Sequence, residues 1–301
     1  MTVIEVKNLS KSFGKVRAVE DLNFSVEKGE IFGFLGPNGA GKTTTIRCIM
    51  DFVKPTSGEI KLLDRNANIN SHCLKNKIGY LPGNVKLYES WSGSDHFSLL
   101  EAISGKSNNL SMLVEKLDFN PGMKAYQLSS GNRQKLGLIM ALMHEPEILI
   151  MDEPTVGLDP LLQNTIYDIL EDLRSKGTSI FMSSHNLPEV ERLCNRVGII
   201  KDGKMIAQES IDNLRSKRIH RITINFNDKF AIQDFVFDSV EVVETFPDRI
   251  VLSTKGDINP LIKKLSNYEI QDISIEHASL EEVFLEFYAK DKTQKEDKCG
   301  Q

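Results

Sequence analysis

A glycine-rich segment directly after a short apolar run constrains this chain more than any other feature. The run Glu30–Leu35 predicts a buried strand, and Gly36–Thr43 (GPNGAGKT) matches the pattern G-x-x-x-x-G-K-[ST], whose backbone N–H groups surround phosphate oxygens. Gly41–Met50 then predicts a helix, whose N-terminal end favours anions. Given the usual frequency of glycine, a chance match is on the order of one in a hundred. The segment therefore predicts the start of an α/β fold.

Two carboxylates follow a second apolar run that also predicts a buried strand. The run Glu147–Met151 ends directly before Asp152 and Glu153. Beside a phosphate loop, Lys42 is expected to reach the β- and γ-phosphates, and Thr43 to place its hydroxyl on Mg²⁺. Asp152 is then expected to hold the metal, and Glu153 to polarise the attacking water as general base. The alternative is an ordinary turn after a strand, because Asp-Glu-Pro favours turns.

Three further motifs accompany these two. They are Leu128–Gln134 (LSSGNRQ), Gly157–Pro160 (GLDP) and Ser183–His185 (SSH). In this order and spacing the motifs resemble the ATP-binding cassette (ABC) ATPases, whose signature is usually written LSGGQ, over about residues 1–215. The resemblance implies a P-loop NTPase of the ABC type, an α/β fold that binds ATP and Mg²⁺ and hydrolyses ATP.

The resemblance also implies that two chains share each nucleotide, head to tail. One chain supplies the phosphate loop and Glu153, and the other supplies Ser129 and Gly131 at the start of a helix. Asp159 is implied to reach across the interface, and His185 to contact the γ-phosphate within its own chain. The second chain is implied to be another copy of this one or a related ATPase subunit.

One aromatic side chain, Phe13, lies where the family stacks adenine. Base–aromatic stacking contributes ~1–3 kcal/mol in nucleic-acid proteins. A core phenylalanine is the alternative interpretation. The residues implied to contact nucleotide are Phe13, Gly36, Pro37, Asn38, Gly39, Ala40, Gly41, Lys42, Thr43, Thr44, Ser129, Gly131 and Asp159.

Two departures from the family pattern bear on activity. In the signature, Ser130 replaces the usual first glycine and Asn132 the usual glutamine. We expect the site to work, because Ser129 and Gly131 remain. The larger departure follows the segment IGYLP, where Gly83 and Asn84 stand at the place of the family's Q-loop glutamine. Asn84 or a water molecule is expected to substitute in part.

Residues from about 85 to 145 carry several helical patterns and few β-branched runs, which predicts a helical subdomain on the sheet. Within it, the segment 86–100 holds Leu87, Tyr88 and Trp91. We expect this aromatic segment to lie near a groove that receives the cytoplasmic helix of a membrane partner. Packing inside the helical subdomain is the alternative.

Residues 216–290 predict a small C-terminal α+β domain. The expected elements are strands at 221–226, 240–246 and 249–254, a helix near 259–265, a further strand, and a last helix with Leu280, Val283, Phe284 and Phe287 on one face. The charged tail 291–301 lacks apolar anchors and is predicted to be disordered.

Composition narrows the classes of partner. The net charge of −5 does not favour a nucleic-acid partner, which would call for a basic face. The four cysteines are far apart in sequence, so we expect reduced thiols in the cytosol. The first residues do not resemble a signal peptide, and no apolar run approaches the ~20 residues of a spanning helix. Any membrane role is therefore expected to go through a partner.

The segment LPGN, the GLDP motif and Ile275–Tyr288 resemble bacterial ABC-2-type exporters of drugs, antibiotics or other lipophilic cargo. This resemblance implies an ATPase peripheral on the cytoplasmic face of the membrane, which powers a separately encoded transmembrane permease. One rival is a soluble ABC ATPase without a membrane partner. Another is a non-hydrolysing ATP-dependent regulator, which the intact Lys42, Asp152, Glu153 and His185 argue against.

Overall fold

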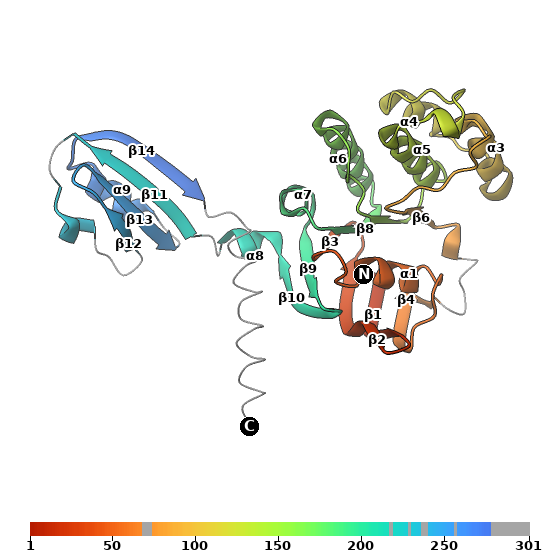
Figure 1. Ribbon diagram of the computed structural model, residues 1–301, viewed down its shortest axis with the longest axis horizontal. Helices are drawn as coiled ribbons and strands as arrows, with labels where there is room; N and C mark the ends of the chain where they lie inside the picture. The colour runs from red at the N-terminus through yellow and green to blue at the C-terminus, as the bar shows by residue number, and fades with distance from the viewer. Residues whose placement is uncertain (68–73, 217–218, 228–229, 236–239, 256–257, 278–301) are drawn as a thin grey trace. The chain divides into compact units, whose positions relative to one another are not determined.

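The computed structural model describes residues 1–301 except 68–73, 217–218, 228–229, 236–239, 256–257 and 278–301 (Figure 1). The chain divides into two compact units, Met1–Gln208 and Glu209–Gln301. This division falls before the predicted boundary at residue 215, so that the short helix α8 (Ile211–Ser216) belongs to the second unit. Among the described residues, no helix is both long and apolar enough to cross a membrane.

An antiparallel sheet of four strands opens the first unit, in the order β2-β1-β4-β5. β1 and β2 form a long hairpin that closes where Phe13 pairs with Val16. Buried and exposed side chains largely alternate in both strands, as expected for a sheet with one face on the core. The strands are β1 (Thr2–Phe13), β2 (Val16–Glu27), β4 (Ser57–Leu62) and β5 (Arg65–Asn66).

A six-stranded sheet forms the centre of the unit, in the order β10-β9-β3-β8-β7-β6. The pairs β9/β3, β3/β8, β8/β7 and β7/β6 are parallel. β3, β7 and β8 are buried along their whole length, because both faces of the sheet are covered. The carboxyl ends of these three strands meet at one edge, where the loops that follow them come together. The strands are β3 (Ile31–Leu35), β6 (Ile78–Leu81), β7 (Ile148–Asp152), β8 (Ser179–Ser184), β9 (Arg196–Lys201) and β10 (Lys204–Ser210).

The helix α1 (Lys42–Ile49) packs between the two sheets. Its Ile46 and Ile49 are fully buried in one core with side chains of β1, β2, β3, β7 and β8. Phe24, Phe32 and Phe181 stack at the centre of this core, with ring centroids 5.5–5.9 Å apart. The sequence prediction of a strand, glycine loop and helix in this order is confirmed.

Helices α6 (Pro160–Ser175) and α7 (Leu187–Leu193) flank β8 in the chain (Figure 1). The buried face of α6 includes Leu162, Ile166 and Ile169, which recur at helical spacing, and Leu173 is half-buried. Helices α3 (Gly93–Ser104), α4 (Leu110–Lys116) and α5 (Ser130–Leu142), with a 3₁₀ turn at Ala125–Gln127, follow β6 and fill the region from about 85 to 145. The expectation of a helical region there is confirmed.

The second unit contains an antiparallel sheet in the order β12-β13-β11-β14. Its core joins Ile222, Ile224 and Phe226 of β11 to Leu261 and Leu265 of α9. The elements are β11 (Ile219–Phe226), a 3₁₀ turn (Ile232–Phe235), β12 (Val240–Thr245), β13 (Arg249–Lys255), α9 (Asn259–Leu265) and β14 (Ile270–His277). These match the predicted strands and helix, whereas the predicted last helix and tail lie outside the described residues.

Candidate nucleotide site

The glycine segment Gly36–Thr43 links β3 to α1 at the carboxyl edge of the central sheet. Gly41 precedes the helix with a φ of 106°, a left-handed conformation that glycine adopts without strain, and no side chain caps the helix. A Cβ atom on Gly36 would lie 2.3 Å from the carbonyl oxygen of Ile200, so only glycine fits there. The first N–H groups of α1 are therefore available for phosphate oxygens.

The ammonium group of Lys42 lies inside this loop. Its Nζ donates to the carbonyl oxygens of Gly36 at 2.6 Å and Pro37 at 3.2 Å. The same Nζ forms an ion pair with Glu153 Oε1 at 3.0 Å, and the lysine is only 6% exposed. A buried ammonium group needs such partners, since its desolvation is unfavourable. The loop thus holds one positive charge between its own backbone and the end of β7.

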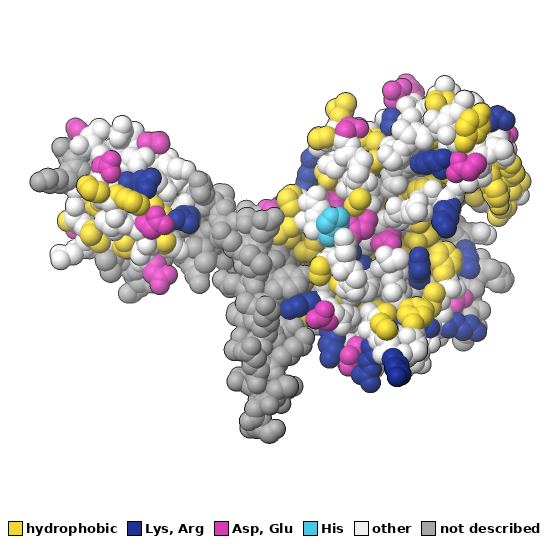
Figure 2. All heavy atoms as spheres, in the orientation of Figure 1, with side chains coloured by type: hydrophobic (Ala, Val, Ile, Leu, Met, Phe, Trp, Pro, Cys, Tyr) yellow, Lys and Arg dark blue, Asp and Glu magenta, His cyan; other side chains and the backbone are white. Residues whose placement is uncertain are grey.

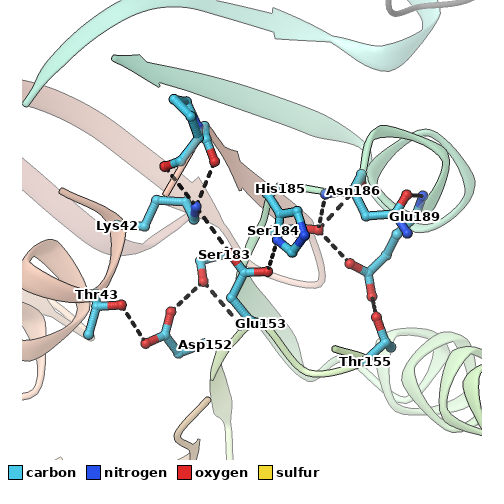
Figure 3. A network of polar contacts seen from close by, with 12 residues as sticks. Lys42, Thr43, Asp152, Glu153, Thr155, Ser183, Ser184, His185, Asn186 and Glu189 are labelled. Carbon is cyan, nitrogen blue, oxygen red and sulfur yellow. Dashed lines mark hydrogen bonds and ion pairs between the residues drawn. The ribbon is translucent and has the colours of Figure 1, made fainter. Parts of the chain in front are cut away.

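Asp152 is the last residue of β7, and its carboxylate accepts hydrogen bonds from α1 and from the neighbouring strand β8 (Figure 3). Its Oδ2 accepts a hydrogen bond from Thr43 Oγ1 at 2.8 Å, and its Oδ1 accepts one from Ser183 Oγ at 2.6 Å. The structure therefore brings the two predicted magnesium ligands into contact. Carboxylate and hydroxyl oxygens are donors that Mg²⁺ prefers, so this pair fits that ion.

Glu153 follows Asp152 in a left-handed conformation with a φ of 53°, which is strained for a residue with a side chain. Its N–H donates to the carbonyl oxygen and to Oγ of Ser183, both at 3.1 Å. Its Oε2 lies 2.6 Å from Nδ1 of His185, while its Oε1 pairs with Lys42 (Figure 3). The carboxylate is thus held from two sides, with 17% of its side chain exposed.

Ser129 of the LSSGNRQ motif and Asp159 of the GLDP motif cap other helices of the first unit. Ser129 is the N-cap of α5, where its Oγ accepts from the N–H of Asn132 at 3.3 Å. Asp159 is the N-cap of α6, where its Oδ1 accepts from the N–H of Leu162 at 2.9 Å. Ser129 is exposed, and within the described part of the chain no hydrogen bond or ion pair joins Ser129, Gly131 or Asp159 to Asp152 or Glu153. The cap uses the backbone of Asn132, so the unusual side chain does not disturb it.

Phe13 lies at the tip of the β1–β2 hairpin. It is 51% exposed and pairs with Val16, which is 65% exposed, so the alternative of a core phenylalanine is wrong. The same hairpin approaches the phosphate loop, because a Cβ atom on Gly41 would lie 2.6 Å from the carbonyl oxygen of Ala18. The Phe13 ring is exposed, with Nζ of Lys11 lying 4.9 Å from its centroid, and adenine stacking on this ring stays a prediction.

The segment after β6 lies beside Asp152. A Cβ atom on Gly83 would lie 3.0 Å from the carbonyl oxygen of Asp152, so the backbone of these two residues packs closely. Asn84 is exposed and makes no hydrogen bond with the residues that the structure describes. The partial substitution of Asn84 for the family's glutamine stays a prediction.

Sequence reasoning missed three residues that support the site. Ser183 bonds both Asp152 and Glu153, Gln134 Nε2 donates to the carbonyl oxygen of Pro154 at 2.9 Å, and Glu189 accepts from Thr155 and Ser184. Ser183 and Gln134 belong to motifs that were recognised, but spacing does not reveal which atoms they reach. No pattern in the sequence distinguishes Glu189 from other acids on helices.

This arrangement is that of a P-loop nucleotide hydrolase. The ABC transporter family model matches residues 19–156. The bacitracin transport ATP-binding protein BcrA of Bacillus licheniformis is 31% identical over 299 residues, covering 94% of this chain and 96% of that protein. The linearmycin resistance ATP-binding protein LnrL of Bacillus subtilis is 36% identical over 212 residues, 68% of each chain.

Solved structures agree with the sequence relatives. An ATP binding subunit of an ABC transporter is 30% identical with a TM-score of 0.67, covering 71% of this chain and 92% of that one. A dimeric post-hydrolysis cassette bound to ADP and Pi shares the fold at 23% identity, with a TM-score of 0.63, covering 69% of this chain and 98% of that one. The chain belongs to the ABC transporter ATP-binding family and is an ATPase of that family.

Proposed function

We propose that this chain is the ATP-hydrolysing subunit of an exporter and that it powers a separately encoded transmembrane permease from the cytoplasmic face of the membrane. Relatives named for bacitracin transport and linearmycin resistance support an antibiotic or other lipophilic cargo. The observation that carries the proposal is the convergence of Lys42, Asp152, Glu153 and His185 at one edge of the central sheet.

Each residue of that group has a distinct task in hydrolysis. Bound Mg²⁺·ATP supplies the phosphoanhydride to be cleaved and a metal charge that stabilises its oxygens. Lys42 brings its positive charge to the phosphates, and Thr43 and Asp152 provide oxygen ligands for the metal. Glu153 polarises the attacking water, and His185 holds the Glu153 carboxylate at 2.6 Å from its Nδ1.

A second copy of the chain completes the site. The exposed cap Ser129 and the first turn of α5, with Gly131, present N–H groups that suit a terminal phosphate of the facing copy. Shifting a pair of chains from a closed-to-open ratio of 1:99 to one of 99:1 requires nucleotide to bind the closed pair about 5.5 kcal/mol more tightly than the open pair. Two nucleotides would each supply about half of it, and loss of the γ-phosphate would reopen the pair.

The segment 86–100 is the proposed contact with the permease. Tyr88 is 60% exposed and its ring lies 4.5 Å from that of Trp91, while Leu99 and Ile103 of α3 are also exposed. Hydrophobic side chains gather on the surface of this region (Figure 2). An exposed apolar cluster of this kind suits a protein–protein interface.

A polar contact links this segment to the signature helix. Arg133 of α5 donates from both of its terminal nitrogens to the two carboxylate oxygens of Glu89, at 2.8 and 2.7 Å. Its guanidinium also donates to the carbonyl oxygen of Ala125 at 2.8 Å. Movement imposed on residues 86–100 would therefore be carried to the helix that begins at Ser129.

Affinity purification from native membranes tests the partner. The tagged chain should recover a polytopic membrane protein, and Trp91→Glu and Tyr88→Glu should release it while ATP turnover of the purified chain persists. Met112→Glu, on the exposed side of α4, is the matched control. Recovery of the chain without any membrane protein would favour the soluble ABC ATPase instead.

Glu153→Gln tests the hydrolytic role. The variant should bind ATP with native affinity, lose turnover, and fail to protect cells against the cargo. Turnover at the native rate would contradict the assignment of Glu153 as general base.

A further inference from the structure

A buried carboxylate lies behind the Glu153–His185 pair without a role in the site as described. Glu189 comes from the first turn of α7 and is only 3% exposed. Its Oε1 accepts a hydrogen bond from Thr155 Oγ1 at 2.6 Å, and its Oε2 accepts one from Ser184 Oγ at 2.6 Å (Figure 3). One hydroxyl comes from the loop after β7, and the other comes from the last residue of β8.

We propose that Glu189 is a positioning residue for ATP hydrolysis, which ties the loop of Glu153 to the loop of His185. Thr155 is two residues after Glu153, and Ser184 directly precedes His185. Beside the bonds that Ser183 makes to Asp152 and Glu153, the Glu189 side chain therefore adds a second link between the two segments whose catalytic groups meet at 2.6 Å. This inference rests on the roles proposed above for Glu153 and His185.

The loop that carries Glu153 is anchored from several other elements. Gln134 of α5 donates to the carbonyl oxygen of Pro154 at 2.9 Å, and Gln163 of α6 donates to that of Thr155 at 3.3 Å. Because α5 and α6 already hold the Glu153 loop, the main effect of Glu189 is on the Ser184–His185 turn. Its bond from Ser184 holds that turn at a set distance from the Glu153 loop.

A carboxylate is an unfavourable choice for packing alone. Burial raises the pKa of Glu189, while the hydrogen bonds from Ser184 and Thr155 lower it. A glutamine or leucine of similar size would avoid the desolvation of a charge. Because the carboxylate accepts from both hydroxyls at once, it supplies what an amide cannot, since one end of an amide is a donor. The two hydrogen bonds that this buried side chain accepts therefore fit a role in positioning the segments beside the reacting groups.

Steady-state kinetics of four variants test the inference. Glu189→Gln, Thr155→Val and the double variant should each lower kcat at least tenfold, with the KM for ATP within twofold of native. The double variant should be no worse than the worse single one, because both changes remove the same link. Glu171→Gln, an exposed acid on α6, should leave kcat unchanged.

The number of ATP molecules bound per mole of protein separates positioning from folding, because a misfolded fraction lowers that number whereas loss of positioning leaves it at the native value. If Glu189→Gln does not fold, Thr155→Val, Ser184→Ala and their double variant provide the same cycle, and additive losses of kcat would overturn the proposal. Native kcat in Glu189→Gln, with Glu153→Gln inactive, would overturn this inference alone. Native turnover in Glu153→Gln would instead overturn the roles on which it rests.

Discussion

Removing the hydroxyl of Ser183 should destabilise the first unit and weaken its magnesium site. Ser183 is fully buried, and its Oγ both donates to Asp152 Oδ1 at 2.6 Å and accepts from the N–H of Glu153 at 3.1 Å. The Glu153 N–H retains a second acceptor in the Ser183 carbonyl oxygen, so the main loss in Ser183→Ala is the bond to a buried carboxylate. A hydrogen bond to a charged group contributes about 1.5–3 kcal/mol, so we expect a loss of about 2 kcal/mol.

Urea unfolding followed by tryptophan fluorescence measures this loss directly. Trp91 is the single tryptophan of the chain and lies in the first unit, so its signal reports that unit alone. The expected loss corresponds to a fall in Tm of about 4–8 °C for a unit of this size. The Mg²⁺ concentration for half-maximal turnover should also rise about tenfold, as for other residues that orient a metal ligand.

Ser111→Ala, at an exposed position of α4, is the matched control and should leave both quantities unchanged. A free energy of unfolding for Ser183→Ala within about 0.5 kcal/mol of the native value, the usual range for neutral surface changes, would refute the reasoning.

Three further predictions concern the loop, the hairpin and a buried thiol. Gly36→Ala should weaken ATP binding at least tenfold in a nucleotide titration, because its Cβ would lie 2.3 Å from the Ile200 carbonyl oxygen; native affinity would contradict this. Phe13→Ala should weaken ATP binding by about 1–3 kcal/mol while Phe13→Tyr does not, and equal affinities would remove the stacking role. Burial raises the pKa of Cys48 to about 11, so at pH 8 the native protein should alkylate there roughly a hundredfold more slowly than the unfolded chain. Peptide mass spectrometry at Cys48 measures this, and equal rates would contradict it.

Local pattern was enough to predict the elements that carry the site. The strand before the phosphate loop, the helix after it and the strand before Asp152 lie within one residue of their predicted bounds. The helix Asn259–Leu265 has its predicted bounds. These predictions succeed because strand and helix periods and glycine conformations are properties of neighbouring residues.

Contacts between distant residues were not predictable in the same way. Glu189 reaches Thr155, 34 positions earlier, and Gln134 reaches Pro154 across 20 positions. Such partners depend on how α5, α6 and α7 pack on the sheet. The spacing of residues along the sequence does not predict that packing. The exposure of Phe13 likewise depends on where the hairpin ends relative to the core.

The molar mass of the hydrolysis-blocked chain in Mg²⁺·ATP tests the central claim most directly. Glu153→Gln should double its mass by size exclusion with light scattering when ATP is added. Adding Gly131→Asp should prevent this at unchanged ATP affinity, because the new carboxylate would repel the γ-phosphate of the facing copy. A Cβ atom on Gly131 meets nothing closer than 3.7 Å, so the substitution fits the fold. A Glu153→Gln chain that stays monomeric with ATP bound, or a double variant that still dimerises, would contradict the account.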